Sequence, residues 1–362
     1  SGGNIKRVRA LYEEILSQHP HHLRILLALA ALETADGNTS AAEQLVKRAM
    51  THHPDELAPR LWLARKYLAE GDTQKSLELF EEVEKYHRED PGFLAVLGEA
   101  QLRAGKTMAG MKTHQTLAKL APEDAHIQYM YARACAIYGD YLCLGGALIK
   151  GLRLQPDHPA IPVLLQHLIA LSSSPASLHK LLWRLQQAAP DNSLLIRVRG
   201  EYAMRTNQMH DAIVIYREAH DRFPSEWYWF QQLAHALARS GDQVGALSII
   251  HQWIATHPKE ASAWLLEGKI LQESGKTEQA REIYAHVLAL EPDNVQALNN
   301  LAWILREHDP EKAKKYAEQA VALSPGYITR DTLGAILLQL GENEQAEQLL
   351  REAFGEQPES AT

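Results

Sequence analysis

Prolines recur along this chain at a fixed spacing, and that spacing restricts the possible fold more than any other feature. Pro20 and Pro54 lie one step of 34 residues apart. The same step separates the neighbours in the series Pro122, Pro156, Pro190, Pro224, Pro258 and Pro292, and steps of 33 lead to Pro325 and Pro358. One period over almost all of the 362 residues predicts a single repeat array instead of two or three separate globular domains.

Each repeat unit, numbered so that its proline is position 32, has small residues at fixed places. Residues 261–294 show this most clearly, with Trp264 at position 4, Gly268 at 8, Gly275 at 15, Ala280 at 20, Tyr284 at 24 and Pro292 at 32. Small residues at positions 8 and 20 allow two helices to cross closely, and glycine at position 15 can end a helix in the left-handed conformation. This pattern resembles the tetratricopeptide repeat over about residues 4–358.

The resemblance implies an all-α, right-handed superhelical solenoid of about ten full helix-turn-helix units plus an N-terminal half repeat, about 21 helices in all. We expect an expression scar at residues 1–3, a half repeat at 4–22, regular units at 23–158, a degenerate unit at 159–192, regular units at 193–358 and a tail at 359–362. The full units are predicted to begin at Leu23, Leu57, Pro91, Ala125, Pro159, Ser193, Trp227, Ala261, Val295 and Tyr327. Neither end shows a polar capping helix, which predicts end-to-end pairing through the termini.

Two places depart from the regular pattern. At residues 88–91 the proline expected at Arg88 stands three places later, at Pro91. The unit at 159–192 contains Pro162, has a turn without glycine and carries Leu178 where a small residue belongs. This indicates either a bent unit or sequence drift with normal packing.

Cys135 and Cys143 flank one predicted turn, and we favour two buried free thiols over a disulfide, which would require an oxidising compartment.

Composition and motifs argue against catalysis and several classes of ligand. A net charge of −8 opposes general nucleic-acid binding, and no apolar run is long enough to span a bilayer. The 18 histidines show no HExxH or paired Cys/His spacing, which opposes a metal site. The Gly-Lys-Thr segments at Gly105 and Gly275 fall on repeat turns and lack the earlier glycine of a phosphate-binding loop. We therefore expect no enzyme activity and no cofactor.

In this family, the first helix of each unit lines a concave groove through positions 2, 5, 6, 9, 12 and 13. The candidate groove contacts selected from these positions are Arg65, Glu99, Tyr129, Arg133, His167, Arg197, Glu201, Tyr228, Gln231, His235, Arg239, Lys269, Asn299, Asn300 and Trp303. Their charges suit an extended, partly anionic peptide or polysaccharide. The alternative is a ladder of ion pairs between neighbouring helices, which would be structural.

Near the C-terminus, the segments Asn299-Asn300-Leu301-Ala302-Trp303 and Asp331-Thr332-Leu333-Gly334 are similar to bacterial arrays, above all the repeat lipoproteins of exosortase (PEP-CTERM) and exopolysaccharide-export loci. This resemblance implies a non-catalytic interaction scaffold in the periplasm or anchored to the envelope, with a protein or peptide partner in the groove or an anionic polysaccharide there. The alternatives are a cytoplasmic adaptor and the repeat arm of a larger enzyme or transporter.

Overall fold

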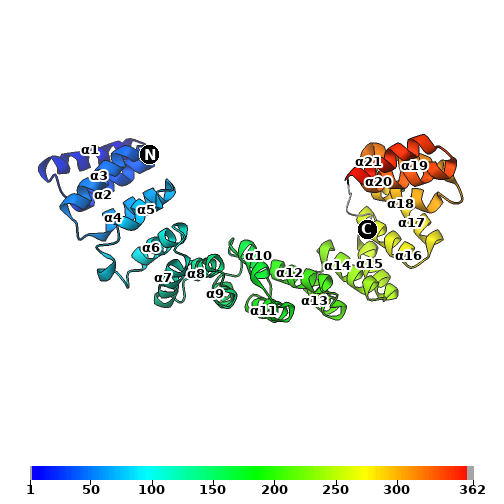
Figure 1. Ribbon diagram of the computed structural model, residues 1–362, viewed down its shortest axis with the longest axis horizontal. Helices are drawn as coiled ribbons and strands as arrows, with labels where there is room; N and C mark the ends of the chain where they lie inside the picture. Colours follow the sequence, from blue (N-terminus) through cyan, green and yellow to red (C-terminus); the bar gives the residue numbers. More distant parts are fainter. Residues whose placement is uncertain (1, 357–362) are drawn as a thin grey trace. The chain divides into compact units, whose positions relative to one another are not determined.

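The computed structural model describes residues 2–356 of the chain (Figure 1). This part contains 21 α-helices, one short 3-10 helix and no strand, which confirms the predicted all-α fold. The first helices are α1 (Gly2–Gln18), α2 (Leu23–Ala35), α3 (Thr39–His52), α4 (Leu57–Ala69), α5 (Thr73–Glu78), η1 (Glu84–Tyr86), α6 (Pro91–Arg103), α7 (Thr107–Leu120), α8 (Ala125–Tyr138), α9 (Tyr141–Leu154), α10 (Ile161–Leu171) and α11 (Pro175–Ala188). The others are α12 (Ser193–Arg205), α13 (Met209–Arg222), α14 (Trp227–Arg239), α15 (Gln243–Thr256), α16 (Ala261–Glu273), α17 (Thr277–Leu290), α18 (Val295–Leu305), α19 (Pro310–Leu323), α20 (Tyr327–Leu340) and α21 (Asn343–Glu356).

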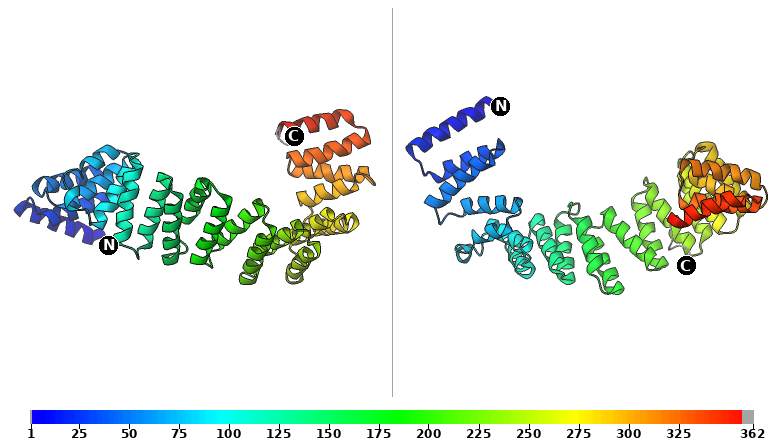
Figure 2. Two further views of the ribbon diagram at one scale, coloured as in Figure 1. Left: turned by 60° about the horizontal axis from the view of Figure 1, so that its bottom comes forward. Right: turned by 45° about the horizontal axis from the view of Figure 1, so that its top comes forward.

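The helices form successive hairpins, each made of a first helix (helix A) and a second helix (helix B). Helix A begins at the predicted residue in every unit except the one expected at Pro159, where α10 begins at Ile161. Pro162 then lies in the first turn of α10, where a proline leaves no helical hydrogen bond unmade. The two helices of a hairpin run side by side, as α6 and α7 do (Figure 2).

Most of the hairpin turns depend on a residue in the left-handed conformation. Seven glycines have φ between 74° and 92°: Gly37, Gly71, Gly105, Gly139, Gly241, Gly275 and Gly341. Asn207, with φ of 58°, occupies the equivalent place in the unit that begins at Ser193. Asparagine is one of the few other residues that adopt this conformation, so the turn is kept without glycine.

Two hairpins depart from the regular pattern. The second helix of the unit starting at Leu57 ends as α5 at Glu78, so the expectation of a regular unit is wrong there. The turn that follows buries Phe80, whose ring lies edge-on to Phe93 at 5.0 Å between centroids. In the other hairpin, α10 packs on α8 and α9, while α11 packs on α9. Leu178 is buried in α11 where most units have a small residue.

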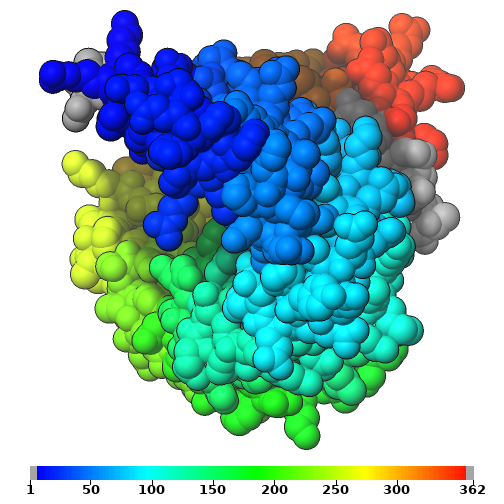
Figure 3. All heavy atoms as spheres, turned by 90° about the vertical axis from the view of Figure 1, so that its left-hand side faces the viewer, coloured from blue at the N-terminus to red at the C-terminus, as the bar shows by residue number. Residues whose placement is uncertain are grey.

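The chain divides into two compact units, Ser1–Leu195 and Ile196–Thr362, called here the N-terminal and C-terminal units. In the N-terminal unit, side chains of successive hairpins meet in a continuous surface, coloured blue to green in Figure 3.

Cys135 of α8 and Cys143 of α9 form a disulfide, with their Cα atoms 5.6 Å apart. Our expectation of free thiols is therefore wrong, and the bond ties both helices of one hairpin together. Over residues 2–356, no helix combines the length and the apolar character needed to cross a bilayer.

Candidate functional site

The candidate site is the face of the A helices, formed by their positions 2, 5, 6, 9, 12 and 13 and called here the A-face. In the N-terminal unit, an ion-pair network occupies part of this face. Glu99 of α6 accepts from Arg103 Nε at 2.6 Å and from Arg133 of α8. Burial acts to raise the pKa of Glu99, but the two arginines outweigh it and hold that pKa below its usual value. Arg103 also donates to the Leu68 carbonyl at the end of α4, at 2.8 Å. These charges satisfy one another, as the structural alternative predicts.

The other predicted contacts of the N-terminal unit differ in exposure. Tyr129 is only 2% exposed, its hydroxyl donates to the Gln155 carbonyl at 2.7 Å, and its ring stacks on His158. This corrects our expectation that Tyr129 faces the groove, because its ring belongs to the interior. Arg65 and His167 are exposed on the A-face.

In the C-terminal unit, the first part of the A-face carries a polar cluster. The Tyr228 hydroxyl donates to Glu201 at 3.2 Å, and Arg197 Nε lies 3.9 Å from the same carboxylate. Burial, and then the negative charge of Glu201, raises the pKa of Tyr228, so its phenol stays protonated as a donor. Gln231 is half-buried one turn further along α14.

The aromatic run around Tyr228 is largely part of the core. Trp229 and Phe230 are buried, and the Trp229 indole donates to Glu226 at 2.9 Å. Trp227 is half-buried, with its ring 5.4 Å from that of Trp253. The run therefore contributes mainly packing, and Tyr228 remains its A-face residue.

Basic side chains gather where α14 and α16 are neighbours. Burial lowers the pKa of His235, and the positive charges of Lys269 and Arg239 lower it further, against an opposite effect of Glu273. Lys269 is half-buried and makes no ion pair with any residue in the described range 2–356. A lysine without a carboxylate partner is available to bind an anion.

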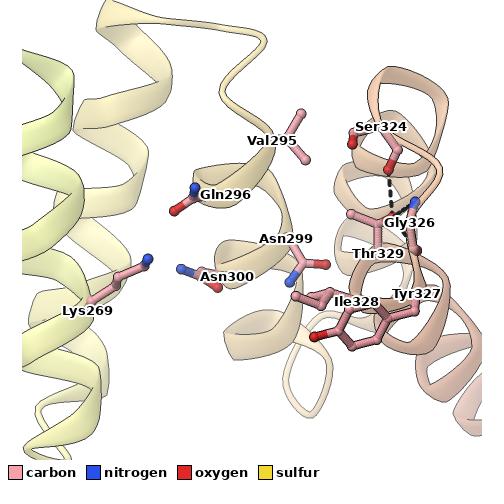
Figure 4. A pocket seen from close by; sticks show the side chains of 10 residues that line it. All are labelled: Lys269, Val295, Gln296, Asn299, Asn300, Ser324, Gly326, Tyr327, Ile328 and Thr329. Atoms are coloured by element: carbon pink, nitrogen blue, oxygen red, sulfur yellow. Dashed lines mark hydrogen bonds between the residues drawn. The ribbon is translucent and has the colours of Figure 1, made fainter. Parts of the chain in front are cut away.

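Beside Lys269 lies a cavity of about 410 Å³ in the C-terminal unit (Figure 4). Lys269 and Asn300 extend toward each other across it, with Gln296 close by. Its walls are formed by Lys269, Val295, Gln296, Asn299, Asn300, Ser324, Gly326, Tyr327, Ile328 and Thr329. Asn299 is 8% exposed, and its buried Oδ1 has no hydrogen-bond partner. The structure thus brings together three of the predicted contacts, Lys269, Asn299 and Asn300.

The wall opposite α18 is held by local hydrogen bonds. The Thr329 hydroxyl donates to the Ser324 carbonyl at 2.8 Å and accepts from the Gly326 N–H at 3.2 Å. These bonds order the start of α20. The last predicted contact, Trp303, is 38% exposed, and the Arg306 guanidinium lies 3.8 Å from its ring centre.

Sequence analysis did not select Val295, Gln296 or Ile328 as contacts. Gln296 and Ile328 stand at position 2 of their units, so the repeat numbering places them on the A-face. They were missed because at position 2 we selected only the aromatic Tyr228.

The site is suited to binding. Within residues 2–356, no group of three or more His, Cys, Asp or Glu residues could hold a metal ion. The polar groups that line the cavity instead offer hydrogen bonds and the charge of Lys269 to a bound molecule.

Two sequence-family models, both described as tetratricopeptide repeat, match this chain at residues 2–65 and 67–134 and at residues 265–328, together more than half of it. The chain belongs to the tetratricopeptide repeat family. The hairpins α2–α3, α6–α7 and α18–α19 lie wholly within the matched residues.

Among curated proteins, this tetratricopeptide repeat chain is similar to cellulose synthase operon protein C of Pseudomonas fluorescens (strain SBW25). The two are 32% identical over 123 residues, which is 33% of this chain and 10% of that protein. This chain therefore matches only a tenth of the relative's length.

Solved structures with a similar fold include yeast Tom70, which is 13% identical with a TM-score of 0.48, covering 98% of this chain and 89% of that one. MamA from Desulfovibrio magneticus RS-1 is 18% identical with a TM-score of 0.39, covering 48% of this chain and 98% of that one. At such TM-scores these likenesses carry no functional argument, and the family assignment depends on the sequence repeats.

Proposed function

We propose that this chain is a non-catalytic scaffold that binds a protein partner on the A-face of its C-terminal unit. One observation carries the proposal: the cavity beside Lys269 contains a cation without a carboxylate and a buried amide oxygen without a donor. Unpaired polar groups cost stability in a folded protein unless another molecule pairs with them. A binding site is one place where such a cost is offset.

We further propose that the scaffold works in a bacterial envelope, in exopolysaccharide export. The Cys135–Cys143 disulfide supports this location, because disulfides persist in the periplasm and are rare in the reducing cytosol. The name of the curated relative, a cellulose synthase operon protein, favours a polysaccharide pathway over exosortase-type protein sorting. A cytoplasmic adaptor and the repeat arm of a larger enzyme are the competing hypotheses.

Location is tested by the state of the two cysteines in cells. Maleimide labelling of the protein in intact, unreduced cells should leave Cys135 and Cys143 unmodified until dithiothreitol is added. Labelling without reductant would place the chain in a reducing compartment and support the cytoplasmic adaptor.

Binding is tested by affinity capture from a bacterial envelope extract. The chain should retain a protein that the double variant Arg239→Glu with Lys269→Glu loses, while the variant still shows its helical circular dichroism. Lys276→Glu is the matched control, since it reverses an exposed charge at a hairpin turn away from the A-face. Equal capture by all three proteins would contradict binding on this face.

A further inference from the structure

Three successive B helices of the N-terminal unit, α7, α9 and α11, contain lysine and arginine but no acidic residue. The basic residues are Lys112, Lys119, Lys150, Arg153, Lys180 and Arg184. The whole chain has 45 acidic residues against 37 lysines and arginines, so this segregation runs against its composition. The B helices α13, α17, α19 and α21 of the C-terminal unit each combine both signs of charge.

The six basic side chains have no partner that explains them. All are exposed, and none forms an ion pair with another residue in the described range 2–356. By contrast, Arg281 pairs with Glu278 in α17. The helix dipole accounts for Lys119 and Arg153 alone, because only these two lie in the last turn of their helices. The fold therefore gives no use for the other four charges.

The six residues share one surface, called here the basic B-face. In Figure 1, α7, α9 and α11 lie along one edge of the N-terminal unit, and α6, α8 and α10 lie along the other. Equivalent positions of successive repeats face the same way in a solenoid. Lys112 and Lys180 occupy one such position, and Lys150 and Arg184 occupy another. Between residues 107 and 188 the acidic residues all lie outside the helices, at Glu123, Asp124, Asp140 and Asp157.

Large apolar side chains are exposed on the same helices. Leu142 is 80% exposed, Met108 is 51% exposed and Trp183 is 47% exposed. Met108 lies one helical turn before Lys112, and Trp183 is next to Arg184, so apolar and basic groups are neighbours on this surface. Exposed apolar groups among polar ones are typical of an interaction surface.

We propose that the basic B-face binds the surface of a lipid bilayer that contains anionic lipids. Its lysines and arginines contact the lipid phosphates, while Leu142, Met108 and Trp183 enter the boundary between headgroups and acyl chains. Tryptophan suits that depth because it has an apolar ring and a polar N–H. This surface lies in a different unit from the cavity beside Lys269, so the inference does not depend on the proposed partner site.

A bilayer fits this face better than an anionic polysaccharide or an acidic protein surface does. Either of these polymers pairs with the basic groups, as a bilayer does. The aliphatic side chains of Leu142 and Met108 offer no hydrogen bonds to sugar hydroxyls or to carboxylates. The acyl boundary of a bilayer removes those side chains from water.

Flotation of the full chain with vesicles tests the charge contribution. One set of vesicles contains equal parts of phosphatidylglycerol and phosphatidylcholine, and the other contains phosphatidylcholine alone. We expect binding to the anionic vesicles that weakens as salt is added, and little binding to the neutral ones. Lys180→Gln with Arg184→Gln should weaken binding about 25-fold, since each basic residue near an anionic surface contributes about fivefold. Arg281→Gln with Arg351→Gln is the matched control, because it neutralises two paired arginines on B helices of the C-terminal unit, and it should change nothing.

Two further variants test the apolar contribution. Leu142→Ser should weaken binding roughly tenfold while circular dichroism stays unchanged, because the side chain is exposed in the free protein. Lipids brominated close to the headgroup should quench part of the tryptophan fluorescence, and Trp183→Phe should remove most of that quenching.

Four results would overturn the inference. They are an absence of vesicle binding, equal binding to anionic and neutral vesicles, binding unaffected by Lys180→Gln with Arg184→Gln, and binding unaffected by Leu142→Ser. Retention of polygalacturonate through Lys180 and Arg184 without vesicle binding would assign the face to a polysaccharide, and retention of an acidic protein there would assign it to a protein. Envelope capture through Arg239 and Lys269 is measured separately, so either proposal can fail while the other stands.

Discussion

Gly268 in α16 gives a quantitative prediction about how the two helices of one repeat fit together. A Cβ atom added there would lie 2.6 Å from Cε1 of Tyr284 in α17. The Tyr284 ring is fully buried, and its hydroxyl donates to Gln272 at 2.8 Å, so the ring has no free space to move into. Overpacking of this kind costs about 1–3 kcal/mol, and the better helix propensity of alanine returns about 1 kcal/mol. Gly268→Ala should therefore lower the free energy of unfolding by about 1 kcal/mol.

The ring, and not the backbone, is the predicted cause of this loss. In the Tyr284→Leu background the clash should be relieved, because a leucine side chain can turn away where a tyrosine ring cannot. Ala132 and Leu148 occupy the equivalent positions of another unit, and both are fully buried. Gly268→Ala should then stabilise the chain by about 1 kcal/mol, which gives a coupling energy of about 2 kcal/mol. Urea unfolding of the four proteins, followed by circular dichroism, measures it. A Cβ at Gly146 meets nothing within 4 Å, so Gly146→Ala is the control and should stabilise. A coupling below about 0.5 kcal/mol would refute the reasoning.

Further predictions concern the N-terminal unit. Burial lowers the pKa of His114 from 6.5, so the folded state favours the neutral ring. The contribution of His114 to the free energy of unfolding should be complete above pH 6.5. Below that pH it should fall by at most about 1.4 kcal/mol per pH unit. His114→Leu should reduce this slope in urea unfolding, and the remainder belongs to other histidines whose pKa burial lowers, such as His158 and His235. An unchanged slope would assign all of it to those groups. Reduction of Cys135–Cys143 should cost about 2 kcal/mol, a loss seen by hydrogen exchange in α8 and α9 but not in the C-terminal unit. Exchange that rises equally in both units would contradict this. Arg133→Ala should cost less than about 1 kcal/mol, because its pair with Glu99 is partly exposed. A larger loss in thermal unfolding would show that the pair is a major structural contact.

The repeat period is informative because it fixes helix starts and turns together. Proline near position 32 and glycine at position 15 are backbone requirements, so they locate the turns without knowledge of packing. The interruption after α5 could not be predicted in this way, since it depends on how Phe80 packs against Phe93. The displaced Pro91 marked that unit as unusual, but it did not indicate that the second helix would end early.

For the site, position numbering indicated which residues share a face but not which are accessible. Tyr129 stands at a groove position, yet Gly151 leaves room for its ring in the interior. A glycine within the following helix is the signal that could have indicated this burial. The disulfide was also undetermined, because a sequence spacing does not give the distance between two cysteines.

A photo-cross-linking amino acid in the producing cell tests the central claim most directly. Placed at Gln296, on the A-face beside the cavity, it should cross-link to a protein partner, and Lys269→Glu should abolish that product. Placed at Glu278, an exposed residue of helix B in α17, it should not capture the same partner. Equal cross-linking from both positions, or cross-linking from Glu278 alone, would contradict a scaffold that binds through its A helices.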